Sequence, residues 1–137
     1  MNNRIFKFRV WDKLAKHMIY PDKGYQGHYI LDLNGRFHNL QNGSGGDDYV
    51  VMEYTGLTDS QGNPICEGDI VKDTWKENRP YSYSPDEEYD CEKIFEVKYE
   101  DYSFNLDRKY SREQTCVDDF HREVIGNIFE HKHLLEK

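Results

Sequence analysis

Short runs in which apolar and polar side chains alternate cover most of the chain, and they predict β-strands. The first run, residues 4–11, places Phe6, Phe8 and Val10 on one side of the backbone. A period of two is typical of a half-buried strand, because successive side chains point to opposite faces of a sheet. A second extended run follows at residues 18–20 after a polar connection, and we predict that the two runs form a hairpin.

Turn residues separate the next runs. Asn34-Gly35 is a strong short-range hairpin signal, and it predicts pairing between residues 28–33 and 37–40. Residues 41–48 are glycine-rich and polar, which favours a poorly ordered loop. A phosphate-binding loop is the alternative for this segment, but no Lys-Ser/Thr pair and no helix follow it. Residues 49–54 are expected to form another strand.

The stretch 54–72 is expected to organise the rest of the chain. Residues 58–64 combine Gly62, which is free to adopt positive φ, with Pro64, whose φ is fixed. Glu67-Gly68-Asp69 forms a second turn signal, and a β-branched strand begins directly after it. We therefore expect a small, closed β-barrel to start here.

An acidic, tyrosine-rich segment follows at residues 73–93, which we interpret as one long loop. Loops of this length in compact domains are usually functional or disordered. Trp and Tyr supply large contact areas and are common hot-spot residues of protein interfaces. We therefore predict a protein-binding surface made of the aromatic and acidic residues of this loop: Trp75, Tyr81, Tyr83, Asp86, Glu87, Glu88 and Tyr89.

The remaining pattern completes a mainly β protein. Residues 94–99, 102–106 and 123–129 are predicted strands, and Leu134 and Leu135 are expected to pack back on the body from one helical turn. We predict an N-terminal β-hairpin extension over residues 1–55 and a small SH3-like β-barrel over residues 56–137.

Charge divides the chain in the same way. The formal net charge is −8; residues 1–55 hold 7 basic and 6 acidic side chains, whereas residues 56–137 hold 11 basic and 20 acidic ones. Nucleic-acid binding needs a concentrated basic surface, so it is disfavoured. An acidic surface can face a basic protein partner, but an acidic surface that only keeps the protein soluble is the more economical explanation. The alternative is nucleic-acid binding through the N-terminal strand, whose cations alternate with aromatic residues: Arg4, Lys7, Arg9, Lys13 and Lys16.

Cysteine usage and hydropathy indicate the compartment. Cys66, Cys91 and Cys116 are odd in number and far apart, which fits reduced thiols in a cytoplasm. No apolar run reaches membrane-spanning length, and residues 1–12 lack the apolar core of a signal peptide. We expect a cytoplasmic protein without contact to a membrane. Unpaired sheet edges also make self-association into at least a dimer plausible.

Candidate chemistry is sparse. His131 and His133 would need Cys116 or His121 from elsewhere to complete a metal site, and a solvated tail explains them as well. Asp118 and Asp119 beside His121 could in principle transfer protons, but no nucleophile stands near them. Cys66 has no basic neighbour that would activate its thiol. We predict no catalytic residue, no metal site and no cofactor.

Several motifs together carry a family resemblance. They occur from the N-terminal strand to the C-terminal tail: Phe8-Arg9-Val10-Trp11-Asp12, Met18-Ile19-Tyr20, Tyr54-Thr55-Gly56-Leu57, Glu67-Gly68-Asp69-Ile70-Val71 and Val124-Ile125-Gly126-Asn127-Ile128-Phe129. In this order they resemble the YopX family of phage and prophage proteins. The resemblance implies an SH3-like barrel with an N-terminal β extension, a phage or prophage origin, and no assigned biochemical activity. Cys66 stands where the family pattern has an aromatic residue, and residues 131–133 replace Asn-Pro-Glu.

These observations lead to one functional expectation. The protein is expected to be a non-enzymatic accessory protein that binds another protein, and a host factor with a basic surface is the partner class that fits its charge.

Overall fold

The computed structural model describes residues 6–21, 27–78, 88–100, 103–106 and 117–136. The chain forms two compact units, Met1–Gly56 and Leu57–Lys137. The structure is mainly β, as predicted, and its only helical elements in the described part of the chain are two short 3₁₀ turns.

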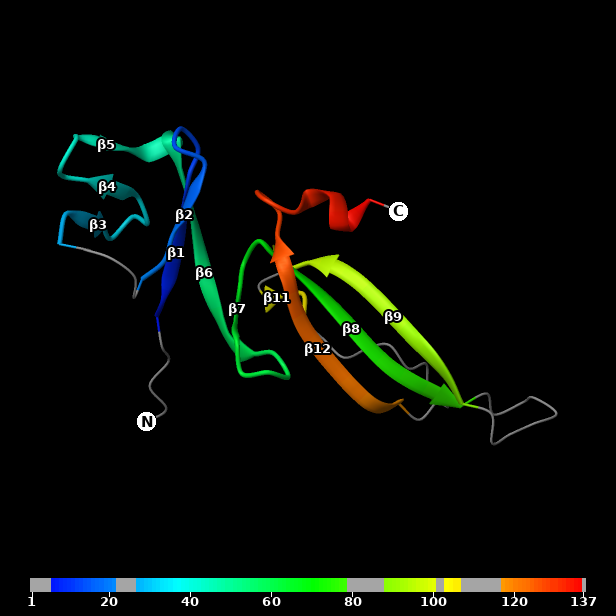
Figure 1. Cartoon of the computed structure of the whole chain (residues 1–137). Helices are drawn as coiled ribbons and strands as arrows, with labels where there is room; N and C mark the ends of the chain where they lie inside the picture. Colours follow the sequence, from blue (N-terminus) through cyan, green and yellow to red (C-terminus); the bar gives the residue numbers. More distant parts are fainter. Residues whose placement is uncertain (1–5, 22–26, 79–87, 101–102, 107–116, 137) are drawn as a thin grey trace, which may run out of the picture. The chain divides into compact units, whose positions relative to one another are not determined.

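The first unit contains two small layers of strands (Figure 1). Its elements are β1 (Phe8–Asp12), β2 (His17–Ile19), β3 (Tyr29–Leu31), β4 (Phe37–Asn39), β5 (Ser44–Gly45), the 3₁₀ turn η1 (Gly46–Asp48) and β6 (Tyr49–Thr58). β2, β1 and β6 are neighbours in one antiparallel sheet, and β3, β4 and β5 form another. Both predicted hairpins are therefore confirmed, and Gly35 adopts the positive φ of 79° that its turn requires.

Two expectations for this unit were wrong. The segment 41–48 contains β5 and η1, so the part predicted to be a poorly ordered loop has defined backbone structure. Strand β1 is also not half-buried: Val10 is buried, but Arg9 and Trp11 on its other side keep only 6% and 8% of their surface exposed. Alternation along a strand shows which side chains share a face, but it does not show whether the second face is covered.

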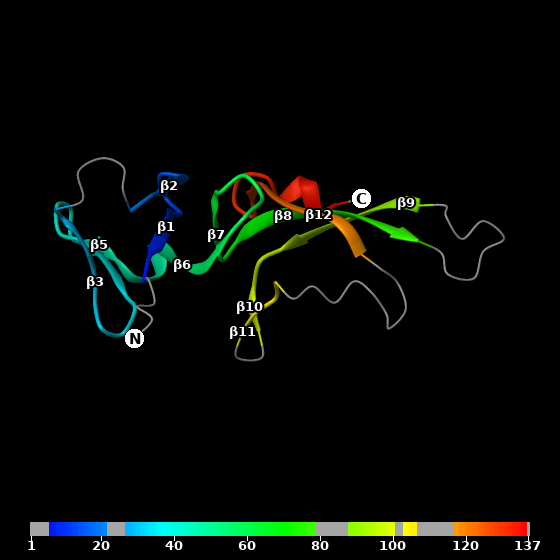
Figure 2. The same cartoon turned by 90° about the horizontal axis from the view of Figure 1, so that it is seen from below.

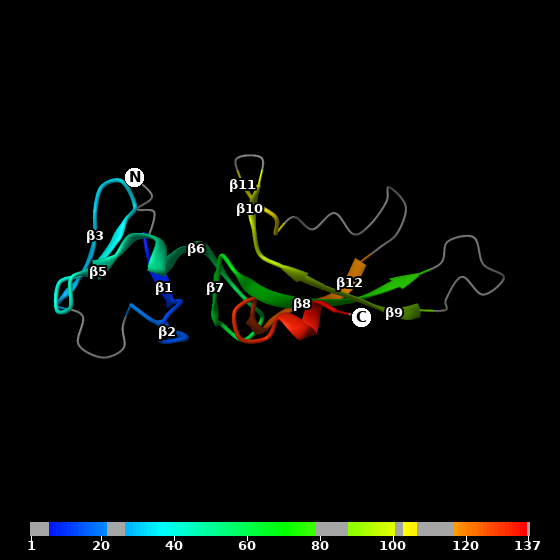
Figure 3. The same ribbon diagram turned by 90° about the horizontal axis from the view of Figure 1, so that it is seen from above.

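The second unit is organised by a three-stranded antiparallel sheet in the order β12-β8-β9. Its elements are β7 (Pro64–Cys66), β8 (Asp69–Asn78), β9 (Glu88–Glu96), β10 (Tyr99–Glu100), β11 (Ser103–Phe104), β12 (Val117–Asn127) and η2 (Lys132–Leu135). The sheet is curled (Figure 1), and the β10–β11 hairpin stands away from it (Figures 2 and 3). Whether this sheet is part of an SH3-like barrel stays a prediction. The predicted helical turn near Leu134 is confirmed by η2.

The boundaries of the predicted loop 73–93 were wrong. Residues 73–78 continue β8 and residues 88–93 belong to β9, with Asp73 opposite Lys93 and Glu77 opposite Tyr89. The last strand also begins earlier than predicted, at Val117. Polar residues occupy both faces of these strands: Lys72 of β8 forms an ion pair with Glu92 of β9 on one face, and Asp73 forms a buried ion pair with Arg122 of β12 on the other.

The stretch 54–72 does organise the second unit. Asp59 accepts hydrogen bonds from the N–H groups of Gln61 (3.0 Å) and Asn63 (2.8 Å) within its own turn, and from Val124 of β12 (3.1 Å). Gly68, with φ 85°, donates its N–H to the carbonyl of Val97 (2.9 Å). The turn at Asp59 therefore holds β12, and the turn at Gly68, directly before β8, holds the chain at the end of β9.

Apolar packing in the second unit lies beside these turns. Ile65, Val71, Val97 and Leu106 form its buried cluster. Three half-buried residues pack against that cluster: Phe95, Phe104 and Val124.

Candidate functional site

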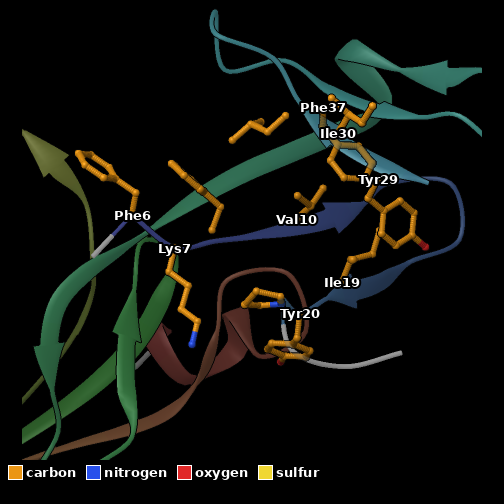
Figure 4. A pocket seen from close by; sticks show the side chains of 11 residues that line it. Phe6, Lys7, Val10, Ile19, Tyr20, Tyr29, Ile30 and Phe37 are labelled. Atoms are coloured by element: carbon orange, nitrogen blue, oxygen red, sulfur yellow. The ribbon is translucent and has the colours of Figure 1, made fainter. Parts of the chain in front are cut away.

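The first unit contains a groove whose described lining is almost entirely apolar. Its volume is about 280 Å³ (Figure 4). The lining comes from the start of β1, the end of β2, β3 and the first residue of β4: Phe6, Lys7, Phe8, Val10, Ile19, Tyr20, Pro21, Tyr29, Ile30, Leu31 and Phe37. It is the site at which we expect a ligand to bind, because contiguous exposed apolar surface usually marks an interaction site.

The alternation of β1 builds the floor of this groove. Phe6, Phe8 and Val10 share one side of the strand, as the sequence predicts, and Val10 belongs to the buried cluster of this unit. Aromatic contacts hold the opposite wall. The ring of Phe37 lies 5.4 Å from that of Tyr29 and 4.6 Å from that of Tyr49, centroid to centroid.

The rim of the groove is open. Phe6 is 67% exposed, Ile30 43% and Tyr20 37%. Among the described residues that line it, Lys7 is the one charged residue, and none is a carboxylate, histidine or cysteine. The groove can therefore hold apolar side chains, and the described part of its lining offers no acid–base pair and no nucleophile.

The predicted binding residues have a different environment. Trp75 lies in β8 and is 8% exposed, and Tyr89 lies half-buried in β9. Both donate to the carboxylate of Glu77: Trp75 through Nε1 (2.8 Å) and Tyr89 through its hydroxyl (2.7 Å). Glu88 belongs to β9, whereas Tyr81, Tyr83, Asp86 and Glu87 lie outside the described residues. A partner-binding role for this set stays a prediction.

The Glu77 cluster has consequences for two titratable groups. The hydrogen bond from Tyr89, followed by that from Trp75, holds the pKa of Glu77 below its usual value. Burial raises the pKa of the Cys91 thiol, and the negative charge of Glu77 raises it further. Cys91 is a free cysteine, as is Cys66, and its raised pKa argues against a nucleophilic role.

A buried ion pair occupies the same face of the sheet. Arg122 of β12 donates from Nε and Nη2 to the two carboxylate oxygens of Asp73, each at 2.7 Å. Asp73 is fully buried, and Arg122 also donates from Nη1 to the carbonyl of Leu106 (3.2 Å). The guanidinium carbon lies 5.3 Å from the centre of the Phe120 ring. Sequence reasoning missed this pair, because its members are separated by 49 residues.

The other candidate chemical groups are described only in part. Among the described residues, no group of three His, Cys, Asp or Glu is placed to hold a metal ion. His131 accepts a hydrogen bond at Nδ1 from the N–H of Asn127 (3.2 Å), so it takes part in the structure of the C-terminal turn. His121 is exposed on β12, and Cys116 and the side chains of Asp118 and Asp119 lie outside what the structure describes.

A histidine–carboxylate pair that the sequence did not suggest lies in the β3–β4 hairpin. His38 Nε2 is 3.0 Å from Asp32 Oδ2, while Asp32 Oδ1 accepts from the N–H groups of Asn34 and Arg36. The hydrogen bond with His38 lowers the pKa of Asp32, and the bond from Arg36 acts in the same direction. Asp32 therefore stabilises the β3–β4 turn, because its carboxylate accepts main-chain hydrogen bonds from residues of that turn.

No helix in the described part of the chain is long and apolar enough to cross a membrane.

Comparison with known proteins identifies a solved structure and a protein family to which the chain is similar. No curated protein matches the chain. Among solved structures, the chain is similar to the crystal structure of protein EF1440 from Enterococcus faecalis, with 27% sequence identity and a TM-score of 0.55. That likeness covers 98% of this chain and 100% of the other. The family model described as YopX protein matches residues 7–136, which is nearly the whole sequence, and the chain therefore belongs to the YopX family.

Proposed function

We propose that this protein is a non-enzymatic protein-binding module, an accessory protein of a phage or prophage that acts in the cytoplasm of the host cell. The observation that carries the binding role is the apolar groove of the first unit. Its rim exposes Phe6, Tyr20 and Ile30 to solvent, and burying such side chains against a partner releases about 25 cal/mol per Å² of apolar surface.

The size and chemistry of the groove favour a protein ligand over a small molecule. Its volume of about 280 Å³ lies at the lower limit of the roughly 300–1,000 Å³ that is usual for small-molecule sites. Such sites orient the ligand with a few precisely placed polar groups; in the described lining, Lys7, Tyr20 and Tyr29 carry the polar side-chain groups, and the other residues are apolar. One or two side chains of a partner would fill the space.

Charge supports a partner with a basic region. Residues 56–137 carry 20 acidic and 11 basic side chains, and Asp90 and Glu92 of β9 are exposed. A negative surface accelerates encounter with a basic partner and disfavours an acidic one. The nucleic-acid alternative receives less support, because Arg9, one of the cations it would use, is 6% exposed. The free thiols of Cys66 and Cys91 are compatible with a reducing cytoplasm.

A capture experiment with two matched variants tests the proposal. The full chain is immobilised, and proteins retained from host lysate are compared for the wild type, Tyr20→Lys and Tyr99→Lys. Both tyrosines are exposed, at 37% and 53%, but Tyr99 lies in β10 of the second unit. We expect Tyr20→Lys to lose the retained protein and Tyr99→Lys to keep it. Equal retention by all three proteins would refute binding through the groove.

A further inference from the structure

The groove lies between two terminal strands. β2 ends the order β2-β1-β6-β7, and β3 ends the order β3-β4-β5. Ile19 of β2 and all three residues of β3 line the groove. A terminal strand presents unpaired main-chain groups at its outer edge, and such an edge is a template for an added strand.

The hydrogen-bond pattern identifies the main-chain groups at the outer edge of β3. Asp32 donates its N–H to the carbonyl of Arg36 (3.0 Å), and Leu40 donates to the carbonyl of His28 (2.8 Å). In an antiparallel pair, hydrogen-bonded and non-bonded residues alternate. Ile30 therefore bonds to β4, and the N–H and C=O groups of Tyr29 and Leu31 point away from β4.

The same two residues also shape the groove with their side chains. Tyr29 and Leu31 pack against the cluster of Val10, Phe37 and Tyr49. A strand that bonds to their main chains would place alternate side chains on the face they share, toward the groove. β2 is a less suitable edge for an added strand. The register of β1 with β2 and β6 directs the main-chain groups of His17 and Ile19 toward β1, so Met18 is the one residue of β2 whose main-chain groups point outward.

We propose that the groove accepts an extended segment of a partner protein, which adds as a strand to the outer edge of β3 at Tyr29 and Leu31. This inference rests on the proposed protein-binding function and specifies its mode. The segment carries an apolar side chain at every second position, because each of these enters an apolar groove. The inserted segment is neutral or acidic, because the lining includes the cation of Lys7 and no carboxylate among the described residues; the basic region favoured above is a separate part of the same partner.

Amide hydrogen exchange with synthetic peptides tests the mode directly. The probe is a pool of peptides of about eight residues, long enough to extend past both ends of β3. Val, Ile, Leu, Phe or Tyr occupies every second position, Thr lies between them, and Glu ends each peptide. We expect the amides of Tyr29 and Leu31 to exchange about tenfold more slowly once about nine tenths of the protein is bound.

Backbone methylation of the peptides supplies the control, and it leaves the folding of the protein unchanged. Two sets of peptides carry N-methyl groups on alternate residues. In the first phase of methylation, the methyl groups replace the N–H donors that face β3; in the second phase, they are shifted by one residue and replace the donors that face solvent. We expect methylation in the first phase to weaken binding roughly tenfold or more, and methylation in the second phase to have little effect.

Three results would overturn the inference. The first is unchanged exchange of Tyr29 and Leu31 at saturating peptide, and the second is equal binding of both methylated forms. The third is protection of these amides without peptide in a sample whose light-scattering mass equals two chains, because a second copy would then be the occupant. Any of these results would reject strand addition. If Tyr20→Lys nevertheless loses the captured protein, the proposed binding through the groove still holds.

Discussion

Removal of the guanidinium from the buried Arg122–Asp73 pair is expected to destabilise the second unit strongly. In Arg122→Leu, the Asp73 carboxylate loses two hydrogen bonds of 2.7 Å while it stays fully buried. Breaking a buried ion pair from one side costs about 3–5 kcal/mol, because the remaining charge is left without compensation. Domains are stable by about 5–15 kcal/mol, so this single change removes a large part of the folding free energy.

The double variant Asp73→Val/Arg122→Leu separates the ion pair from simple loss of packing. Replacing both partners with apolar residues removes the cost of a buried charge, and such exchanges are often neutral or stabilising. We expect the double variant to recover at least about 2 kcal/mol relative to Arg122→Leu. The surface pair between Lys72 and Glu92 on the same sheet, at 3.2 Å, supplies the control. Lys72→Ala is expected to cost less than about 1 kcal/mol, because both side chains are more than one third exposed.

Urea unfolding followed by circular dichroism and tryptophan fluorescence measures these differences. Because the chain has two compact units, the two signals must be fitted together to show whether the units unfold in one transition. A cost below about 1 kcal/mol for Arg122→Leu would refute the assigned role of the pair. If the costs of the single variants Arg122→Leu and Asp73→Val simply added up in the double variant, the role of the pair would be refuted as well.

Three further predictions concern local structure. Asp59 titration should make stability pH-dependent: burial alone would raise its pKa, but the N–H groups of Val124 and Asn63 outweigh this and lower it. Its contribution is therefore complete above the unfolded-state pKa of about 4 and is lost as the pH falls through the lower folded-state pKa, so Asp59→Asn should flatten the acid limb of the stability curve. Gly126→Ala should cost about 1–3 kcal/mol in a denaturation assay, because an added Cβ would lie 2.7 Å from the His131 ring and 2.8 Å from the Cβ of His131. His131→Ala should relieve only part of this cost, because it removes the ring and keeps the Cβ. Glu77→Gln should lower the pKa of Cys91, whose thiol should then react faster with iodoacetamide at mildly alkaline pH when peptides are quantified by mass spectrometry; an unchanged rate would contradict the influence of Glu77.

Local patterns predicted those parts of the fold that local chemistry decides. The alternation of Phe6, Phe8 and Val10 placed the floor of the groove on one face of β1. Asn34-Gly35 and the turn around Gly62 fixed chain reversals, because positive φ is needed there and glycine adopts it readily.

Contacts between distant residues explain the main errors. A charged residue such as Asp73 is typical of a loop. In the structure Asp73 is buried in β8, because the guanidinium of Arg122, far away in the sequence, neutralises its carboxylate. The polar pattern therefore predicts a loop over residues 73–93, whereas residues 73–78 lie in β8 and residues 88–93 in β9, with Trp75 buried. The groove could not be predicted either, because β1, β2 and β3 line it together only after two sheets have packed.

The most direct test of the proposed function is to map a captured partner on the isotope-labelled chain by NMR. The protein-binding account predicts that amide signals of Ile19, Tyr29 and Leu31 shift or broaden when the partner is added, and that Tyr20→Lys abolishes these changes. Shifts confined to residues of the second unit, such as those around Trp75 and Tyr89, would contradict binding through the groove.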